Sequence, residues 1–427
     1  MALFTTLCVF AGILVATRLG APLFAALLAA SLLIGAAFTS DAGRTLTVTA
    51  EGFILPTTVG LALVNILQVV LSAVMQQGGQ MRRVVDLAGQ VLRRPAVSMV
   101  ALPALIGLLP MPGGALFSAP MVEASIGEHS VPGHKLSAVN YWFRHIWEHW
   151  WPLYPGVLTA VALTKLSFST FMSFQIPLGI FMTLAGLLVM RGIHPDLHKA
   201  RASADRGAKR ELLWMTSSIW VIVLVAILVG RLLGLVSFGA DWQKAIDKFG
   251  PIFAGLFISV IWTVFLNRMN GRTFRQLWLN KSIYTMTMLV ASVMVFQHVL
   301  EATGVPGMIA SELKDIKAPL ILVIALLPAI AGLVTGLAVG FVATSFPIIL
   351  PLAAELAQGN SILPYVALAY GFGHLGQMIS PIHLCYIVSN QYFKAGFGDV
   401  YKHFLPSALV TGCATVAYFF ATRWLGF

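Results

Sequence analysis

Long apolar runs separated by short polar segments extend over the whole chain. A run of about 20 apolar residues is long enough to cross a bilayer as a helix. Two further apolar segments, residues 96–126 and 319–357, are too long for one helix and are each interrupted by Pro, Gly and small polar residues. We predict that both are re-entrant hairpins, which enter and leave the membrane on the same side. The predicted spans are residues 2–17, 22–38, 53–76, 136–164, 170–190, 213–233, 250–266, 282–303, 361–390 and 403–424.

The second half of the chain repeats the first at a spacing close to 229 residues. The spacing falls to 225 in the hairpins and then returns to 229, as expected if only loop lengths differ. Self-similarity kept in order over several segments indicates an internal structural repeat. The matched pairs include Pro22 and Pro251, Gly107 and Gly332, Pro120 and Pro347, His145 and His374, and Pro177 and Pro406.

Each half carries three spans, one hairpin and two further spans, so each half crosses the membrane an odd number of times. The second half is therefore expected to be inverted relative to the first, an arrangement typical of secondary transporters. We predict a first repeat at residues 1–190, a charged cytoplasmic linker at 191–211 and a second repeat at 212–427. The predicted fold class is all-α integral membrane, with about ten transmembrane helices.

Composition supports a membrane protein and excludes a separate soluble domain. Hydrophobic residues make up 58% of the 427 residues and charged residues 10%, against roughly 25% charged in soluble domains. The formal charge of +11 comes from Lys and Arg in short loops, which indicates membrane topology and no nucleic-acid partner. With both termini outside, 18 of the 27 basic residues fall in cytoplasmic loops. We therefore predict a multi-pass protein of the cytoplasmic (inner) membrane.

Four interruptions of the apolar segments are candidate ligand sites, at residues 110–120, 150–156, 334–347 and 379–384. Non-helical backbone within a membrane is tolerated only inside protein or around a water-filled cavity. The alternative is that their Gly and Ser residues only permit close helix packing. Na⁺ is a candidate coupling ion at the hairpin tips, near Gly113 and Thr335. The candidate substrate-binding residues at these interruptions are Gly113, Gly114, Ser118, Thr335, Gly336, Thr344, Ser345, Ser380 and His383.

Arg144 lies within a predicted span. A guanidinium keeps its charge, and placing it within the membrane costs roughly 2.5 kcal/mol or more, so it requires an anionic partner or an aqueous cavity. One interpretation is structural, an ion pair with Glu148 one helical turn further on. The other is that Arg144 attracts an anionic substrate.

His145, Glu148 and His149 spell H-x-x-E-H, the inverted motif of some zinc proteases. His145 has a repeat partner in His374, whereas Glu148 and His149 are matched by other residue types, which favours a role for His145 in the fold. A third zinc ligand is not indicated, and the three cysteines lack metal-ligand spacing. We therefore expect no cofactor or bound metal, apart from Na⁺ as a coupling ion. Glu148 and His149 are candidates for proton coupling, and His145 and His374 are further candidates for substrate binding.

The segments LPMPGGALFSAPMV (109–122) and NYWFRHIWE (140–148) resemble an uncharacterised integral-membrane transporter family related to the gluconate permeases, within the ion-transporter superfamily. The resemblance covers nearly the whole chain. It implies a homodimer with a scaffold domain and a mobile transport domain, which carries organic anions by elevator movement coupled to Na⁺ or H⁺. Neither hairpin tip contains the Ser-Asn-Thr triplet typical of divalent-anion/sodium symporters, so their dicarboxylate specificity and sodium sites do not carry over directly.

The function predicted from these observations is secondary active transport of an organic anion, such as a carboxylate or sugar acid, and not catalysis. The partners implied are the small anion, the lipid bilayer and a second copy of the chain. Two alternatives stay open: a zinc-dependent intramembrane hydrolase that uses His145, Glu148 and His149, and a passive anion channel.

Overall fold

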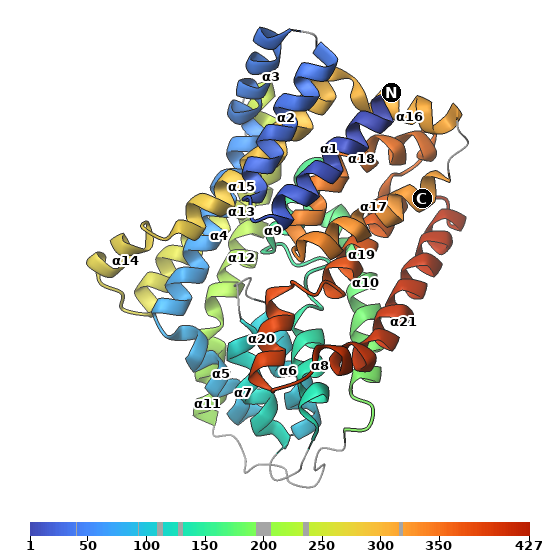
Figure 1. Cartoon of the computed structure of the whole chain (residues 1–427). Coiled ribbons are helices and arrows are strands. Elements are labelled where there is room, and N and C mark those ends of the chain that lie inside the picture. The colour runs from blue at the N-terminus through green and yellow to red at the C-terminus, as the bar shows by residue number, and fades with distance from the viewer. Residues whose placement is uncertain are drawn as a thin grey trace.

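The computed structural model describes residues 1–39, 41–92, 94–108, 114–126, 131–193, 206–233, 239–315 and 319–427. Within these ranges the regular secondary structure is entirely helical (Figure 1). The helices are α1 (Ala2–Arg18), α2 (Leu23–Thr39), α3 (Ala42–Ile54), α4 (Pro56–Gln77), α5 (Gln80–Val91), α6 (Pro95–Gly107), α7 (Ala115–Ile126), α8 (Gly133–Arg144), α9 (Pro155–Thr164), α10 (Phe168–Val189), α11 (Arg206–Met215), α12 (Ser217–Leu233), α13 (Ala240–Leu266), α14 (Gly271–Leu277), α15 (Lys281–Thr303), α16 (Val305–Asp315), α17 (Leu320–Thr335), α18 (Ala338–Ala357), α19 (Leu363–Met378), α20 (Leu384–Tyr392) and α21 (Phe397–Trp424).

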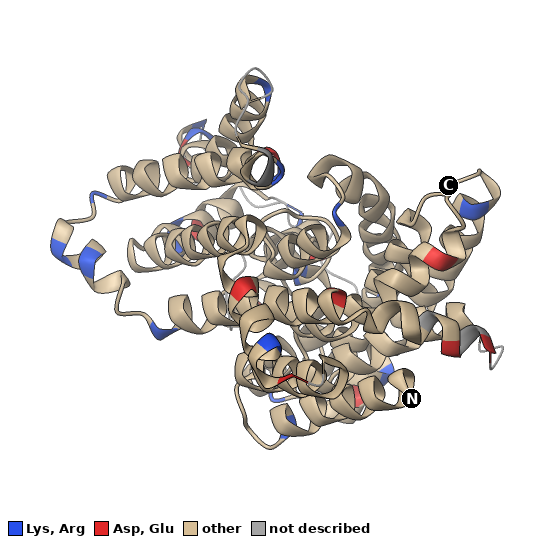
Figure 2. Ribbon diagram, turned by 90° about the horizontal axis from the view of Figure 1, so that it is seen from above, with Lys and Arg blue, Asp and Glu red and all other residues tan. Residues whose placement is uncertain are grey.

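The protein is a multi-pass membrane protein, as the sequence predicts. Six of the described helices are long and apolar enough to cross a bilayer, and α11 with α12, bent by 51°, would make a seventh span. The predicted spans at 136–164 and 361–390 are each divided into two shorter helices, and those at 2–17 and 22–38 form helices of 17 residues. Figure 2 shows the few charged residues mainly at helix ends and in connections.

Both predicted hairpins consist of two consecutive helices. In the second hairpin, one of the two helices is longer than expected. Helices α6 and α7 form the first hairpin, and α17 and α18 the second. At 20 residues, α18 is itself long enough to cross a bilayer, because its apolar sequence continues through Pro347 and Pro351. Of the predicted linker 191–211, residues 194–205 lie outside the described part of the chain, and the remainder includes the start of α11.

The helices pack as two groups. Helices α2, α3, α4, α12, α13 and α15 contact one another and lie together at the upper left of Figure 1. Helices α6 to α10 and α17 to α21 contact one another and form the second group. Helix α1 packs against α2, α16 and α17, and α16 also contacts α18. An ion pair between Arg83 of α5 and Glu211 of α11, with Nε to Oε1 at 2.6 Å, joins the connecting helices of the two halves.

Close backbone contacts join each hairpin to the helix that follows it. A Cβ atom on Gly107 of α6 would overlap the carbonyl oxygen of Arg144, and one on Gly332 of α17 would overlap that of Gly373. Each hairpin helix can therefore approach its neighbour only because glycine lacks a side chain. The two contacts are related by the same spacings, 225 and 229 residues, at which the sequence repeats.

Candidate functional site

Two broken spans meet in the interior of the second helix group. Helix α8 ends at Arg144, residues 145–150 form turns, and α9 begins at Pro155, where a missing N–H costs nothing in the first helical turn. Helix α19 ends at Met378, and α20 begins at Leu384 after a turn that contains Pro381. The second break lies where the sequence predicts it. The first begins several residues earlier than the predicted 150–156, directly after Arg144.

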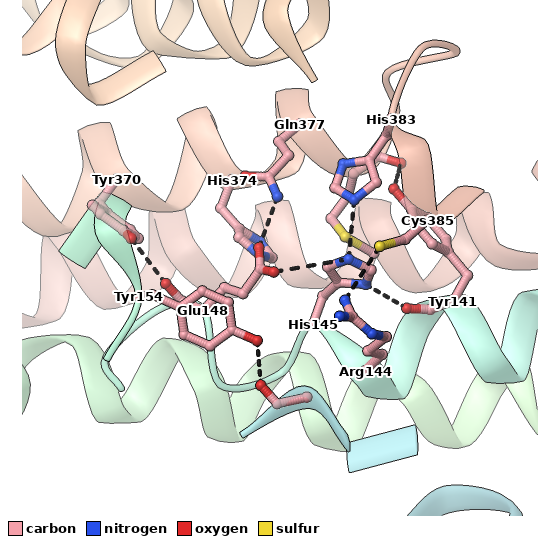
Figure 3. A network of polar contacts seen from close by, with 12 residues as sticks. Tyr141, Arg144, His145, Glu148, Tyr154, Tyr370, His374, Gln377, His383 and Cys385 are labelled. Atoms are coloured by element: carbon pink, nitrogen blue, oxygen red, sulfur yellow. Dashed lines mark hydrogen bonds and ion pairs between the residues drawn. The ribbon is translucent and has the colours of Figure 1, made fainter. Parts of the chain in front are cut away.

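The two breaks bring together a buried cluster of titratable and hydrogen-bonding side chains, and Figure 3 labels all of its members except His149. Each of these residues is at most 6% exposed. The cluster is built from both halves of the chain, so its members are far apart in sequence. It consists of Tyr141, Arg144, His145, Glu148 and His149 from the first half and Tyr370, His374, Gln377, His383 and Cys385 from the second.

Glu148 is held by residues of the second half. Its Oε2 accepts a hydrogen bond from Gln377 Nε2 at 2.7 Å and lies 3.7 Å from His374 Nε2. Its Oε1 lies 3.8 Å from His145 Nε2, and its backbone carbonyl accepts a hydrogen bond from the Tyr370 hydroxyl at 2.8 Å. A buried carboxylate needs such partners to offset its lost hydration. Glu148 therefore fixes the first break against α19.

His145 links the two breaks directly. Its Nδ1 lies 2.6 Å from the carbonyl oxygen of Tyr141, and its Nε2 lies 3.0 Å from Nε2 of His383. Because a carbonyl oxygen can only accept, Nδ1 carries the hydrogen, and in the neutral ring Nε2 is left with its lone pair facing His383.

His149 lies away from this pair and packs against His374, with ring centroids 4.2 Å apart and the ring planes tilted by 44°. Among the described residues, neither of its ring nitrogens has a hydrogen-bond partner. The H-x-x-E-H interpretation requires His145 and His149 to face one ion from successive turns of a helix. Since α8 ends at Arg144, the two rings instead face different residues, His383 and His374. This geometry does not form the inverted zinc-protease site.

Arg144 is 2% exposed, and its Nη1 donates a hydrogen bond to Cys385 Sγ at 3.2 Å. The sequence interpretation placed Glu148 one helical turn beyond Arg144, and this was wrong because the helix ends at Arg144 itself. Figure 3 shows the guanidinium beside Cys385, while the Glu148 carboxylate lies among His145, His374 and Gln377.

The tip of the first hairpin is described only in part, since Gly113 lies outside the described residues. Gly114 is buried, and its carbonyl accepts a hydrogen bond from the Phe117 N–H at the start of α7. Ser118 donates to Asn140 Oδ1 at 2.5 Å, which joins α7 to α8. These contacts attach the described part of this hairpin to the first broken span.

The tip of the second hairpin lies against the second break. Gly336 ends α17 with φ of +64°, and a Cβ there would come within 3.1 Å of Ser380 Oγ and 3.2 Å of the His383 nitrogen. Ser380 donates to the carbonyl of Leu333 at 2.7 Å. The other predicted hydroxyls each donate to a carbonyl of their own helix, which leaves oxygen lone pairs for a ligand. They are Thr335, Thr344 and Ser345.

The family model "Protein of unknown function (DUF401)" matches residues 4–420. The chain belongs to this family. No curated protein matches the DUF401 chain. Its fold is similar to that of the YdaH transporter of Alcanivorax borkumensis, with 16% identity, a TM-score of 0.64 and coverage of 91% of this chain and 90% of that one. It is also similar to Neisseria gonorrhoeae MtrF, from a class of antimetabolite efflux pumps, with 17% identity, a TM-score of 0.53 and coverage of 88% and 83%.

These likenesses show the fold of the DUF401 chain. The closer relation to gluconate permeases and the ion-transporter superfamily stays a prediction.

The sequence analysis missed a cavity of about 1180 Å³ between the two helix groups of the DUF401 chain. Its lining comes from α12, α13 and α15 on one side, and from α9, the start of α10 and residues 151–153 of the first break on the other. The predicted site residues are not among its described lining residues. The sequence contained an indication of this cavity, because basic residues lie at the ends of the apolar segments that line it. Its charged lining residues are Lys165, Arg231, Lys244, Asp247, Lys248 and Glu301.

Proposed function

We propose that this protein is a secondary active transporter that moves an organic anion, of the carboxylate or sugar-acid class, across the cytoplasmic membrane by an elevator-type movement coupled to Na⁺ or H⁺. The observation that carries the proposal is the cationic cavity next to the first broken span. The similarity in fold to YdaH, a transporter, and to MtrF, of a class of efflux pumps, supports the same function.

The charge of the cavity favours an anionic substrate. Four of its lining residues are Lys or Arg and two are acidic. One of the acidic residues, Glu301, is paired with Lys165 at 3.3 Å. A cleft with an excess of one charge and apolar walls concentrates ligands of the opposite charge. The cavity would therefore attract an anion toward residues 151–153, which follow the cluster residues Glu148 and His149 in the first break.

The elevator movement is supported by the way the two helix groups meet. The cavity lies between α12, α13 and α15 and the group that carries both hairpins and both breaks, and beside it α15 contacts α9 and α18. In this proposal the first group is a scaffold that forms a homodimer, and the second moves as the transport domain. Gly107 and Gly332 make the same kind of close backbone contact at matching positions of the two halves, which supports an inverted repeat. An inverted repeat would give the transport domain two equivalent end positions.

The substrate is tested by thermal shift of the purified protein against carboxylates, sugar acids and sulfonates, each with Na⁺, with K⁺ and at two pH values. A ligand that binds the folded state raises Tm, by roughly 3 °C or more when it is well above its Kd. We expect a carboxylate or sugar acid to do so, and to accumulate in proteoliposomes under an ion gradient. Uptake without accumulation would identify a channel, and no response to any anion would contradict the proposal.

Alternating access predicts that the hairpin tips exchange exposure between the two membrane faces. Gly336 is unsuitable for a cysteine probe because of its positive φ, but the neighbouring Leu337 is 44% exposed, and Leu116 in the first hairpin is 54% exposed. We expect Leu337→Cys, with the exposed Cys8 and Cys413 replaced by alanine, to change its rate of labelling by an impermeant maleimide when substrate or coupling ion is added.

Leu116→Cys should change in the opposite sense, because an inverted repeat places the two tips on opposite sides of the site. Leu279→Cys, on the exposed connection between α14 and α15, is the control and should label at a constant rate. Rates for both tips that stay constant under all ligand conditions would argue against an elevator.

A further inference from the structure

Three potential metal ligands from the two breaks converge within the polar cluster. One ring nitrogen of His145, one of His383 and Sγ of Cys385 all lie within 4.8 Å of one another. All three residues are buried. The motif search missed this set because His145 belongs to the first half and the other two to the second. Cys385 also has no cysteine near it in sequence.

We propose that these residues bind a thiophilic divalent metal ion such as Zn²⁺, with the Glu148 carboxylate as fourth ligand. Zinc–nitrogen and zinc–sulfur bonds of 2.0–2.3 Å in a tetrahedron place neighbouring ligand atoms roughly 3.3–3.6 Å apart. The Nε2 atoms of His145 and His383 are 3.0 Å apart, and Glu148 Oε1 is 3.8 Å from His145 Nε2. Glu148 lies outside the group of three that fall within 4.8 Å of one another, so its side chain would have to rotate toward them to complete the site.

The surroundings of these ligands are those of a metal site. Ligating histidines usually donate their second ring N–H to a carbonyl or carboxylate, and ligating carboxylates are themselves hydrogen-bonded. His145 Nδ1 meets the Tyr141 carbonyl, and Gln377 donates to Glu148. The Arg144 guanidinium donates a hydrogen bond to Cys385 Sγ, a contact that a metal-bound thiolate can also accept.

Charge also favours a cation at this position. With Cys385 as a thiolate, the two anionic ligands together outweigh the single charge of Arg144, and a divalent ion between them compensates the charges of both ligands. Because two ligands come from each broken span, the bound ion would hold the two breaks together. The ligand set excludes His149, so this site differs from the one that H-x-x-E-H describes. The inference is independent of the transported substrate.

The test is metal analysis of the full-length protein purified without chelators or a histidine tag. We expect about one equivalent of bound Zn²⁺ by mass spectrometry. After removal of metal, Co²⁺ should give the visible bands of a tetrahedral site and a near-ultraviolet thiolate-to-cobalt charge-transfer band. The charge-transfer band reports the Cys385 ligand directly in wild-type protein, so the result does not depend on whether a variant folds.

Matched variants define the ligand set. Cys385→Ser should lose the charge-transfer band, and His383→Ala should weaken metal binding at least tenfold. Cys413→Ser and His149→Ala should keep both the metal and the band. Wild-type protein that takes up neither Zn²⁺ nor Co²⁺ would overturn the proposal and leave the His145–His383 contact as a hydrogen bond. Loss of metal in His149→Ala would overturn the assigned ligands.

Discussion

Replacing Arg144 with alanine is expected to weaken binding of the transported anion about 100-fold or more, because truncating one partner of a buried charge pair typically costs 2–5 kcal/mol. Arg144 is 2% exposed, lies at the end of α8 and keeps its positive charge at this depth. An anion brought to the first break would meet this charge in surroundings where water screens it little. The measurement is the Kd of the anion identified by thermal shift, determined by calorimetry in detergent.

Two further variants keep this result interpretable. Arg144→Lys retains the charge but loses the planar guanidinium, so binding should weaken by only about tenfold. Arg191→Ala removes an exposed arginine just beyond α10 and should leave Kd unchanged. Size-exclusion profiles matching the wild type show that the variants fold. Wild-type affinity in a folded Arg144→Ala protein would limit Arg144 to its contact with Cys385.

The membrane character and most helices could be predicted from hydrophobic pattern alone, because apolar length is a local property. The segment that forms α10, for example, needs only its own residues to be recognised as a span. The second break was also predictable, since Pro381 stands in an otherwise apolar run. Helices α3, α5, α11, α14 and α16 were missed. They are short, and α14 is too polar to stand out from the loops around it.

The end of α8 could not be predicted, and the error changed the interpretation of the site. The sequence around Arg144 continues as a helical pattern to Pro152, so Glu148 appeared one turn beyond Arg144. In the structure, Glu148 instead meets Gln377 and His374. Which residue of the other half meets Glu148 depends on how α8 and α19 pack. The same is true of the contact between His145 and His383.

Replacing Gly332 with alanine is expected to destabilise the protein by about 3 kcal/mol, at the upper end of the cost of overpacking. A Cβ at this position would overlap the backbone carbonyl of Gly373, and backbone cannot move aside as a flexible side chain can. Helices α17 and α19 would have to separate, and α19 carries His374 and Gln377. The measurement is Tm in detergent, which should fall by roughly 5 °C or more.

Gly107→Ala tests whether the two halves are equivalent, because its Cβ would overlap the carbonyl of Arg144 in the matching position of the first half. Gly12→Ala is the control, since Gly12 lies within α1 with nothing within 4 Å of its Cβ position. That variant should be as stable as wild type or slightly more so, because alanine favours a helix interior.

A Gly332→Ala protein with wild-type Tm would contradict the packing described for α17 and α19. Equal losses for Gly107→Ala and Gly332→Ala would mean that each hairpin depends on the same close contact, as an inverted repeat requires. A loss in only one half would mean that the matched spacing does not reflect equivalent packing.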